Sequence, residues 1–204
     1  MGSVDSDLYK TLRKPSDAQI YKEKGSKFLG YAFPVEDIGQ VENCISHLKK
    51  EHPKARHWCY AWQLGVDKPN FRYNDDGEPN NSAGKPIYGQ IQSFELTNVL
   101  VVVVRYFGGT KLGVGGLVTA YKTAAKLCLD QSDIMTKMLM ENIVLEFDYV
   151  HMNKVMRIIK EYQLQILNQK MELNCLFGIA VRKNKAEEIL NIFKDLRCLD
   201  AKIV

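Results

Sequence analysis

The sequence of 204 residues predicts an α+β protein with two domains, residues 1–140 and residues 141–204. The first domain is centred on Val99–Val104, six consecutive aliphatic residues of which five are β-branched valines. Such a run is typical of a strand that is buried on both faces. The last stretch, about sixty residues, follows strand and helix periodicity in the order β-α-β-β-α-β, which is that of a ferredoxin-like fold. Its apolar stripes supply a core of their own, which favours a separate second domain.

The composition is that of an ordinary globular protein. Hydrophobic residues make up 46% and charged residues 25%, and the net charge of +4 neither requires nor excludes a nucleic-acid partner. The five cysteines form no Cys-x-x-Cys pair, so we expect reduced thiols. No segment has the pattern of a signal peptide, and no apolar run is long enough to cross a bilayer. We therefore expect a cytoplasmic protein with no membrane partner.

Periodicity also defines the elements before the valine strand. Ile20–Val35 predicts two strands joined at Gly25-Ser26, where glycine favours a turn. A helix is predicted over Asp37–Glu51 from apolar residues at helical spacing, and Pro53 ends it. Ala55–Leu64 alternates as a strand with one aromatic face, which is expected to lie in the core.

Residues 73–87 form a long polar loop, and a short helix is predicted over Pro86–Leu96. Three carboxylates within four residues, Asp75, Asp76 and Glu78, are candidates for a divalent metal because hard cations prefer oxygen ligands. The loop lacks the ligand spacing of an EF-hand. The alternative, which we favour, is an acidic turn whose Asp side chains accept backbone N–H groups.

A glycine-rich loop and then a helix follow the valine strand. Five of the nine residues from 108 to 116 are glycine: Gly108, Gly109, Gly113, Gly115 and Gly116. A strand, a glycine loop and a helix N-terminus in this order direct unpaired backbone N–H groups at one point, which suits an anion. Arg105, Lys111 and Lys122 would add positive charge. The loop fits neither the Walker nor the dinucleotide-binding pattern, and the alternative is a tight turn whose glycines only relieve steric conflict.

His57 and Cys59 share one face of the Ala55–Leu64 strand, which invites a nucleophile or metal interpretation. No Asn or Asp that would orient the histidine can be named, and the motifs of zinc deaminases are missing. We therefore expect Cys59 to be a reduced core thiol, do not expect catalysis by the pair, and assign no catalytic residue.

The second domain follows a weak connector at Ile134–Met140. Its predicted elements are strand Asn142–Val150, helix Met152–Tyr162, strands Leu164–Asn168 and Leu173–Val181, helix Asn184–Leu196 and strand Leu199–Val204. No group of residues in this domain suggests catalysis.

Four stretches of the first domain resemble the signature of the IMPACT family, and of its bacterial YigZ-like members in their two-domain form. They are KGSKFLGYA (24–32), ARHWCYAW (55–62), DDGEPNNSAGKPI (75–87) and VVVVRYFGGTKLGVGGLVTAY (101–121). The resemblance implies a left-handed βαβ fold for the first domain, as in the fourth domain of elongation factor G, and a ferredoxin-like second domain. Both folds occur in proteins that contact ribosomes and RNA, which is an analogy at the level of the fold.

The family's motif positions fall on a defined set of residues in this sequence. Besides Arg105 and the loop 108–116, they are His57, Asp75, Asp76, Gly77, Glu78, Pro79, Ser82 and Gly84. The resemblance implies no settled enzymatic activity. It also implies that eukaryotic relatives regulate translation through an additional N-terminal domain.

Three functional hypotheses follow. The first is a non-enzymatic module that binds RNA or the ribosome and regulates translation, with the glycine loop holding phosphates. The second is a hydrolase of a phosphorylated or nucleotide substrate, in which the carboxylates of residues 75–78 hold a divalent metal and His57 is the general base. The third is a regulator of translation or of a stress response that acts through a protein partner. No cofactor is assigned beyond that possible metal.

Overall fold

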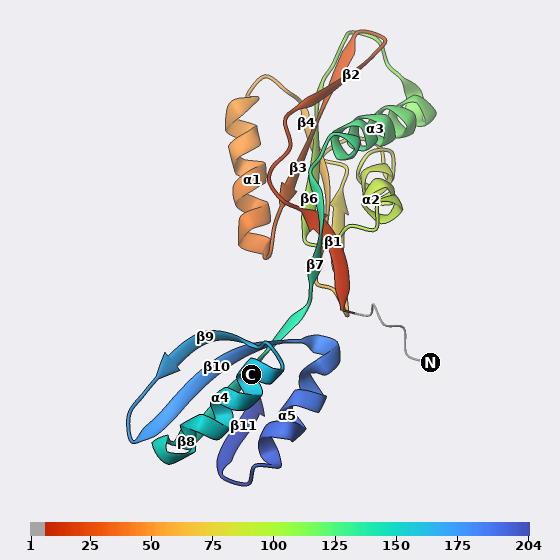
Figure 1. Ribbon diagram of the computed structural model, residues 1–204. Coiled ribbons are helices and arrows are strands. Elements are labelled where there is room, and N and C mark those ends of the chain that lie inside the picture. Colours follow the sequence, from red (N-terminus) through yellow and green to blue (C-terminus); the bar gives the residue numbers. More distant parts are fainter. Residues whose placement is uncertain (1–6) are drawn as a thin grey trace. The chain divides into compact units, whose positions relative to one another are not determined.

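The computed structural model describes residues 7–204 (Figure 1), so residues 1–6 of the predicted first domain lie outside the described residues. The protein is a mixed α+β protein of two compact units. One unit comprises residues 9–137, and the other comprises residues 138–204 together with the described residues before Tyr9. Within residues 7–204 no helix combines the length and the apolar composition that crossing a bilayer requires.

The unit of residues 9–137 is built on a five-stranded sheet in the order β2-β3-β6-β4-β5, with every neighbouring pair antiparallel. Its strands are β2 (Gln19–Glu23), β3 (Ser26–Pro34), β4 (His57–Leu64), β5 (Asn70–Asn74) and β6 (Val99–Tyr106). Its helices are α1 (Ile38–Glu51), α2 (Gly84–Ser93) and α3 (Gly113–Asp130). A separate pair joins β1 (Leu8–Leu12) to β7 (Ile134–Met138). Figure 1 shows α1 on one side of the sheet and α2 and α3 on the other.

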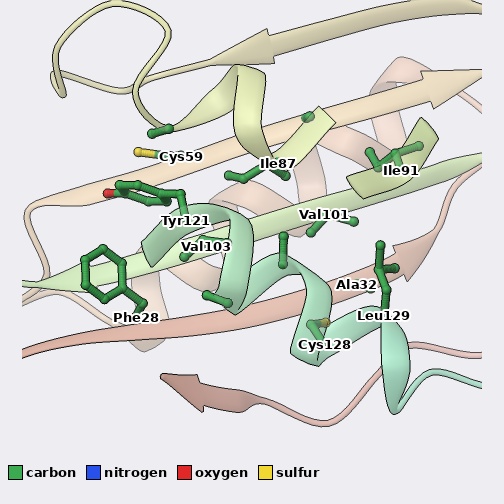
Figure 2. Close-up of a cluster of buried hydrophobic side chains, with 14 of the residues drawn as sticks. Phe28, Ala32, Cys59, Ile87, Ile91, Val101, Val103, Tyr121, Cys128 and Leu129 are labelled. Atoms are coloured by element: carbon green, nitrogen blue, oxygen red, sulfur yellow. The ribbon is translucent and has the colours of Figure 1, made fainter. Parts of the chain in front are cut away.

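The central strand β6 is buried on both faces, as its valine run predicts. Val99, Val101 and Val103 pack in a cluster with residues of α2 and α3 (Figure 2). Leu100, Val102 and Val104 pack on the opposite face, in a cluster that includes Val41 and Leu48 of α1. Each of the six side chains is fully buried, which contributes roughly 1.5–3 kcal/mol for a side chain of this size.

Helix α1 illustrates how local sequence sets an element's bounds. It begins after Asp37, whose carboxylate accepts the N–H of Gln40 as an N-cap, and it ends before Pro53.

The structure differs from the predicted elements at two other places. Helix α2 begins at Gly84, two residues before the predicted start. The predicted connector Ile134–Met140 contains strand β7.

Strands β1 and β5 were not predicted either. β5 lies at the edge of its sheet, and three of its five residues are exposed, so no alternation of apolar and polar residues marks it. Edge strands depend on backbone hydrogen bonds to a neighbour, and those bonds leave no periodic pattern in the sequence.

The second unit has the predicted β-α-β-β-α-β order, with its strands in the antiparallel sheet β11-β8-β10-β9. Its strands are β8 (Met140–Asp148), β9 (Gln165–Lys170), β10 (Asn174–Arg182) and β11 (Leu199–Ile203). Its helices are α4 (Met152–Glu161) and α5 (Ala186–Lys194), each preceded by a 3₁₀ turn, η1 (Tyr149–His151) and η2 (Lys183–Lys185). Apolar residues of both helices pack with alternate residues of the strands in one core of their own.

Candidate functional site

A cavity of about 520 Å³ lies at the C-terminal end of β6, where the strand runs into the glycine loop. Its polar lining residues are Arg56, His57, Glu78, Arg105 and Lys111, and its apolar ones include Pro79, Phe107, Leu112, Val114 and Leu117. These residues come from the start of β4, the acidic loop, the end of β6, the glycine loop and the first turns of α3. The acidic loop and the glycine loop, whose proximity the sequence could not establish, therefore meet at this cavity.

Arg105 forms the floor of the cavity and is only 5% exposed. It lies in register with Phe28 of β3 and His57 of β4, so the three side chains form one row across the sheet. Its guanidinium carbon lies 5.3 Å from the ring centre of Phe28 and 5.6 Å from that of Phe107. Nη1 donates to Oε1 of Glu78 at 2.5 Å, while Nε has no hydrogen-bond partner among the described residues. Aromatic rings on the guanidinium and a carboxylate beside it hold this cation in a fixed place.

Glu78 is the counter-charge of Arg105 and is buried as well. The same Oε1 atom accepts the Tyr121 hydroxyl at 2.8 Å. Figure 2 shows Tyr121 of α3 lying with Phe28 and Cys59 in the core. Burial raises the pKa of the Tyr121 hydroxyl, so Tyr121 stays protonated and donates to the carboxylate. Because Glu78 compensates the charge of Arg105, the floor of the cavity carries little net charge.

His57 is oriented by a group that the sequence did not reveal. Its Nδ1 lies 2.8 Å from the backbone oxygen of Asp76, and since a carbonyl oxygen can only accept, Nδ1 is the donor. In the neutral ring Nε2 therefore keeps its lone pair, and this atom lies 3.9 Å from Oε1 of Glu78. Cys59 has a different role, because its thiol is buried and donates to the Asp75 carbonyl at 3.0 Å. Burial raises the pKa of that thiol, so Cys59 is a core residue as expected, whereas His57 faces the cavity.

The carboxylates proposed as metal ligands have separate partners. Asp75 accepts the N–H groups of Asn81, Ala83 and Gly84 at 2.8–2.9 Å, and its carboxylate thereby caps the start of α2. Asp76 accepts the N–H of Trp58 at 2.7 Å, and Glu78 pairs with Arg105. Within residues 7–204 no three His, Cys, Asp or Glu side chains are grouped so that they could hold a metal ion. The geometry agrees with the acidic-turn interpretation and does not bring Asp75, Asp76 and Glu78 together.

The remaining motif residues of this loop shape its path. Gly77 has φ of +87°, which glycine adopts without strain. The backbone oxygen of the preceding residue, Asp76, accepts the hydrogen bond from Nδ1 of His57. The Ser82 hydroxyl donates to the Pro79 carbonyl at 2.6 Å. A side chain on Gly84 would meet the Asn74 backbone at 2.7 Å, so only glycine allows α2 to start this close to β5.

Substituting Asp75 with Ala should lower the free energy of unfolding of the unit of residues 9–137 by about 1–3 kcal/mol, because three backbone N–H groups lose their acceptor. Asp75→Asn keeps an oxygen for Ala83 and Gly84 and should cost less. Urea denaturation followed by tryptophan fluorescence measures both. Equal costs for the two substitutions would contradict the capping role.

The glycine loop is only partly available to a ligand. The N–H of Gly108 donates to the Ser26 hydroxyl at 3.1 Å, so this amide already has an acceptor within the protein. Gly109, Gly113 and Gly115 are exposed, with open space where a Cβ atom would be. Helix α3 begins at Gly113 without a side-chain cap among residues 7–204, so its first N–H groups have no side-chain acceptor there.

The other residues proposed for the anion site, glycines as well as lysines, also differ in where they lie. Lys111 and Gly113 line the cavity, whereas Gly115 and Gly116 line a smaller hollow of about 260 Å³ on the other side of the loop. Lys122 is exposed on α3 and lines neither of the two, so the structure does not place it in the site.

Arg56 and Phe107 are among the lining residues that the sequence did not identify as candidates. Phe107 is 43% exposed although it is aromatic, and it directly precedes the glycine pair Gly108-Gly109. Arg56 immediately precedes His57, and its backbone N–H donates to the Arg105 carbonyl at 3.3 Å. Two features of the sequence could have indicated these residues. Phe107 is an aromatic residue next to the glycine loop, and Arg56 is a cation next to a motif histidine.

Comparison with known proteins identifies the family of this chain. Residues 24–129 match the family described as the Impact N-terminal domain. The chain is 35% identical over 177 residues to an IMPACT family member of Haemophilus influenzae, which covers 85% of this chain and 86% of that protein. The chain belongs to the IMPACT family.

Within the IMPACT family the chain is of the bacterial YigZ-like type. It is 30% identical over 167 residues to the IMPACT family member YigZ of Escherichia coli, covering 81% of this chain and 82% of YigZ. A crystal structure described as that of a hypothetical protein has a TM-score of 0.73 and 26% identity, and covers 97% of this chain and 98% of its own. The segment that matches the IMPACT N-terminal domain contains every residue that lines the cavity.

Proposed function

We propose that this protein is a non-enzymatic RNA-binding module with a role in translation regulation, and that the cavity at the end of β6 holds the RNA. The observation that carries the proposal is the gathering of exposed cations and unpaired helix amides around one apolar-walled cavity. Arg56 and Lys111 form no ion pair within residues 7–204, and the uncapped start of α3 lies beside Lys111. Phosphate groups suit both features, because helix N-termini and exposed cations attract anions.

The apolar lining favours a nucleotide over a small inorganic anion. Phe107 offers an exposed ring, and Leu112, Val114 and Leu117 continue the wall. RNA-binding proteins stack unpaired bases on aromatic side chains, and a cavity of this size accommodates a single nucleotide. Single-stranded RNA therefore fits the site better than a duplex, whose bases are paired inside the helix.

The translational part of the proposal rests on family membership, since the resemblance implies that eukaryotic relatives regulate translation. We further propose the finer fold assignments that the resemblance implies. β3 and β4 both run antiparallel to β6, and α1 connects them, which is compatible with the left-handed βαβ unit of the fourth domain of elongation factor G. The strand order β11-β8-β10-β9 supports a ferredoxin-like domain over residues 141–204, following a first domain of residues 1–140.

Neither alternative hypothesis gains comparable support. The metal-dependent hydrolase needs the Asp75 and Asp76 carboxylates, which instead accept backbone N–H groups. A protein partner has no assigned surface and stays a prediction. The five cysteines are free thiols, which supports our proposal of a cytoplasmic location.

Substituting Lys111 or Arg56 with Ala should each reduce the slope of log affinity against log salt for single-stranded RNA by about 0.7, the value per lost phosphate contact. Fluorescence anisotropy with a labelled octauridylate, titrated at several salt concentrations, measures the slope. Lys122→Ala is the matched control, because it removes the same charge from α3 outside the cavity. An effect of Lys122→Ala equal to that of Lys111→Ala would show non-specific attraction and contradict the proposed site.

A further inference from the structure

The cavity contains a hydrogen-bond acceptor that phosphate binding does not use. His57 lines the cavity with its Nδ1 proton committed to the Asp76 carbonyl at 2.8 Å. The other nitrogen of the neutral ring, Nε2, therefore accepts a hydrogen bond. The His57 side chain is 22% exposed, so this acceptor can be reached from the cavity.

Within residues 7–204 no donor is hydrogen-bonded to Nε2 of His57. The Glu78 carboxylate lies 3.9 Å from Nε2, and a carboxylate oxygen is itself an acceptor. Oε1 of Glu78 is already occupied by Arg105 and Tyr121. Two acceptors side by side at the inner wall of the cavity call for a hydrogen-bond donor on the ligand.

A phosphate diester has no such donor, so a second group of the ligand must supply it. In RNA the 2′-hydroxyl is a donor that lies next to the 3′-phosphate, and this hydroxyl is what distinguishes RNA from DNA. Arg56, Lys111 and His57 line the same cavity, so the two cations would hold the phosphate while His57 accepts from the hydroxyl of the same ribonucleotide.

We propose that His57 selects ribose over deoxyribose by accepting the 2′-hydroxyl proton of a bound ribonucleotide. This inference rests on the proposed RNA-binding function and specifies its ligand. The acidic loop orients His57, because the hydrogen bond to the Asp76 carbonyl places the proton on Nδ1 and leaves Nε2 of the neutral ring as the acceptor. The motif Asp-Asp-Gly-Glu therefore contributes to recognition through a backbone oxygen and not through metal binding.

The test compares four oligouridylates of the same length that differ only at the 2′ position: hydroxyl, hydrogen, O-methyl and fluoro. Binding to the full chain is measured by fluorescence anisotropy at one salt concentration and at pH 8. The hydroxyl form should bind roughly 3- to 10-fold more tightly than each of the other three, which is the value of one hydrogen bond between uncharged groups. The fluoro and O-methyl forms keep an RNA-like sugar but lack the donor, so they separate donor recognition from sugar shape.

Variants assign the effect to His57. His57→Ala should bring the four affinities together, and His57→Gln, whose amide oxygen can accept at the same place, should restore part of the preference. Lys111→Ala should weaken all four alike and leave their ratios unchanged. The fluorescence of Trp58 and Trp62, which lie in β4 after His57, reports whether each variant is folded.

The outcomes separate the inference from the function on which it rests. Equal binding of all four oligonucleotides, or of the hydroxyl and fluoro forms, would overturn the role of His57 while RNA binding itself stands. Preference for the hydroxyl form that survives in His57→Ala would overturn it as well. No binding of any form would overturn both proposals.

Discussion

Glu78→Ala is expected to lower the free energy of unfolding of the unit of residues 9–137 by about 3–5 kcal/mol. The substitution leaves the Arg105 guanidinium buried without its counter-charge, between the rings of Phe28 and Phe107. It also removes the acceptor of the buried Tyr121 hydroxyl. An unpaired buried charge cannot recover the hydration that it lost on folding, so the cost exceeds that of an exposed ion pair.

Urea denaturation followed by tryptophan fluorescence measures this effect in the right part of the chain. Both tryptophans, Trp58 and Trp62, lie in β4 of this unit, so the signal does not report on residues 138–204. Glu78→Gln keeps an acceptor oxygen for Tyr121 and should cost less than Glu78→Ala.

A double substitution tests whether the pair itself is responsible. Combining Glu78→Ala with Arg105→Met removes both charges and leaves an apolar side chain between the two rings. The double variant should be more stable than the sum of the two single effects predicts, with a coupling of about 0.5–3 kcal/mol. Strictly additive costs, or a loss below 1 kcal/mol for Glu78→Ala, would show that the pair does not stabilise the fold as inferred.

Gly108→Ala is expected to destabilise the same unit by about 3 kcal/mol, at the upper end of the cost of overpacking. A Cβ atom at this position would lie 1.8 Å from the carbonyl carbon of Gly25 and 2.1 Å from the Ser26 nitrogen. Both are backbone atoms, which cannot rotate away as a side chain can. The turn between β2 and β3 would have to separate from the glycine loop, and the bond from Gly108 to the Ser26 hydroxyl would be lost.

Gly115→Ala is the matched control, because it makes the same chemical change in the same loop-helix segment. No atom lies within 4 Å of a Cβ atom at Gly115, and the residue is in α3. Alanine is favoured over glycine in a helix by roughly 0.5–1 kcal/mol, so this variant should be slightly more stable than the wild type. Thermal unfolding monitored by tryptophan fluorescence compares the two. Effects of the same sign would show that packing against Gly25 does not explain why residue 108 is glycine.

The elements and the family could be predicted from the sequence because their signals are local. The valine run of β6, the apolar spacing of α1 and the pattern of each strand and helix after residue 140 depend on residues that are close together in the sequence. The four motif stretches identified the IMPACT family for the same reason, since each is contiguous. The metal hypothesis shows the limit of such signals. Three neighbouring carboxylates suggest a shared ligand, but neighbouring residues in a turn point in different directions.

Hydrophobic periodicity and contiguous motifs act over short distances along the chain, so the α+β class, the buried central strand and the family could be predicted from the residues alone. The site depends on long-range contacts that the fold creates. The fold brought Ser26, Glu78 and Arg105 together across separations of up to 79 residues, and it paired His57 with a backbone oxygen that no residue type encodes. Side-chain direction and long-range pairing depend on how the strands align, and strand alignment results from packing the whole domain at once.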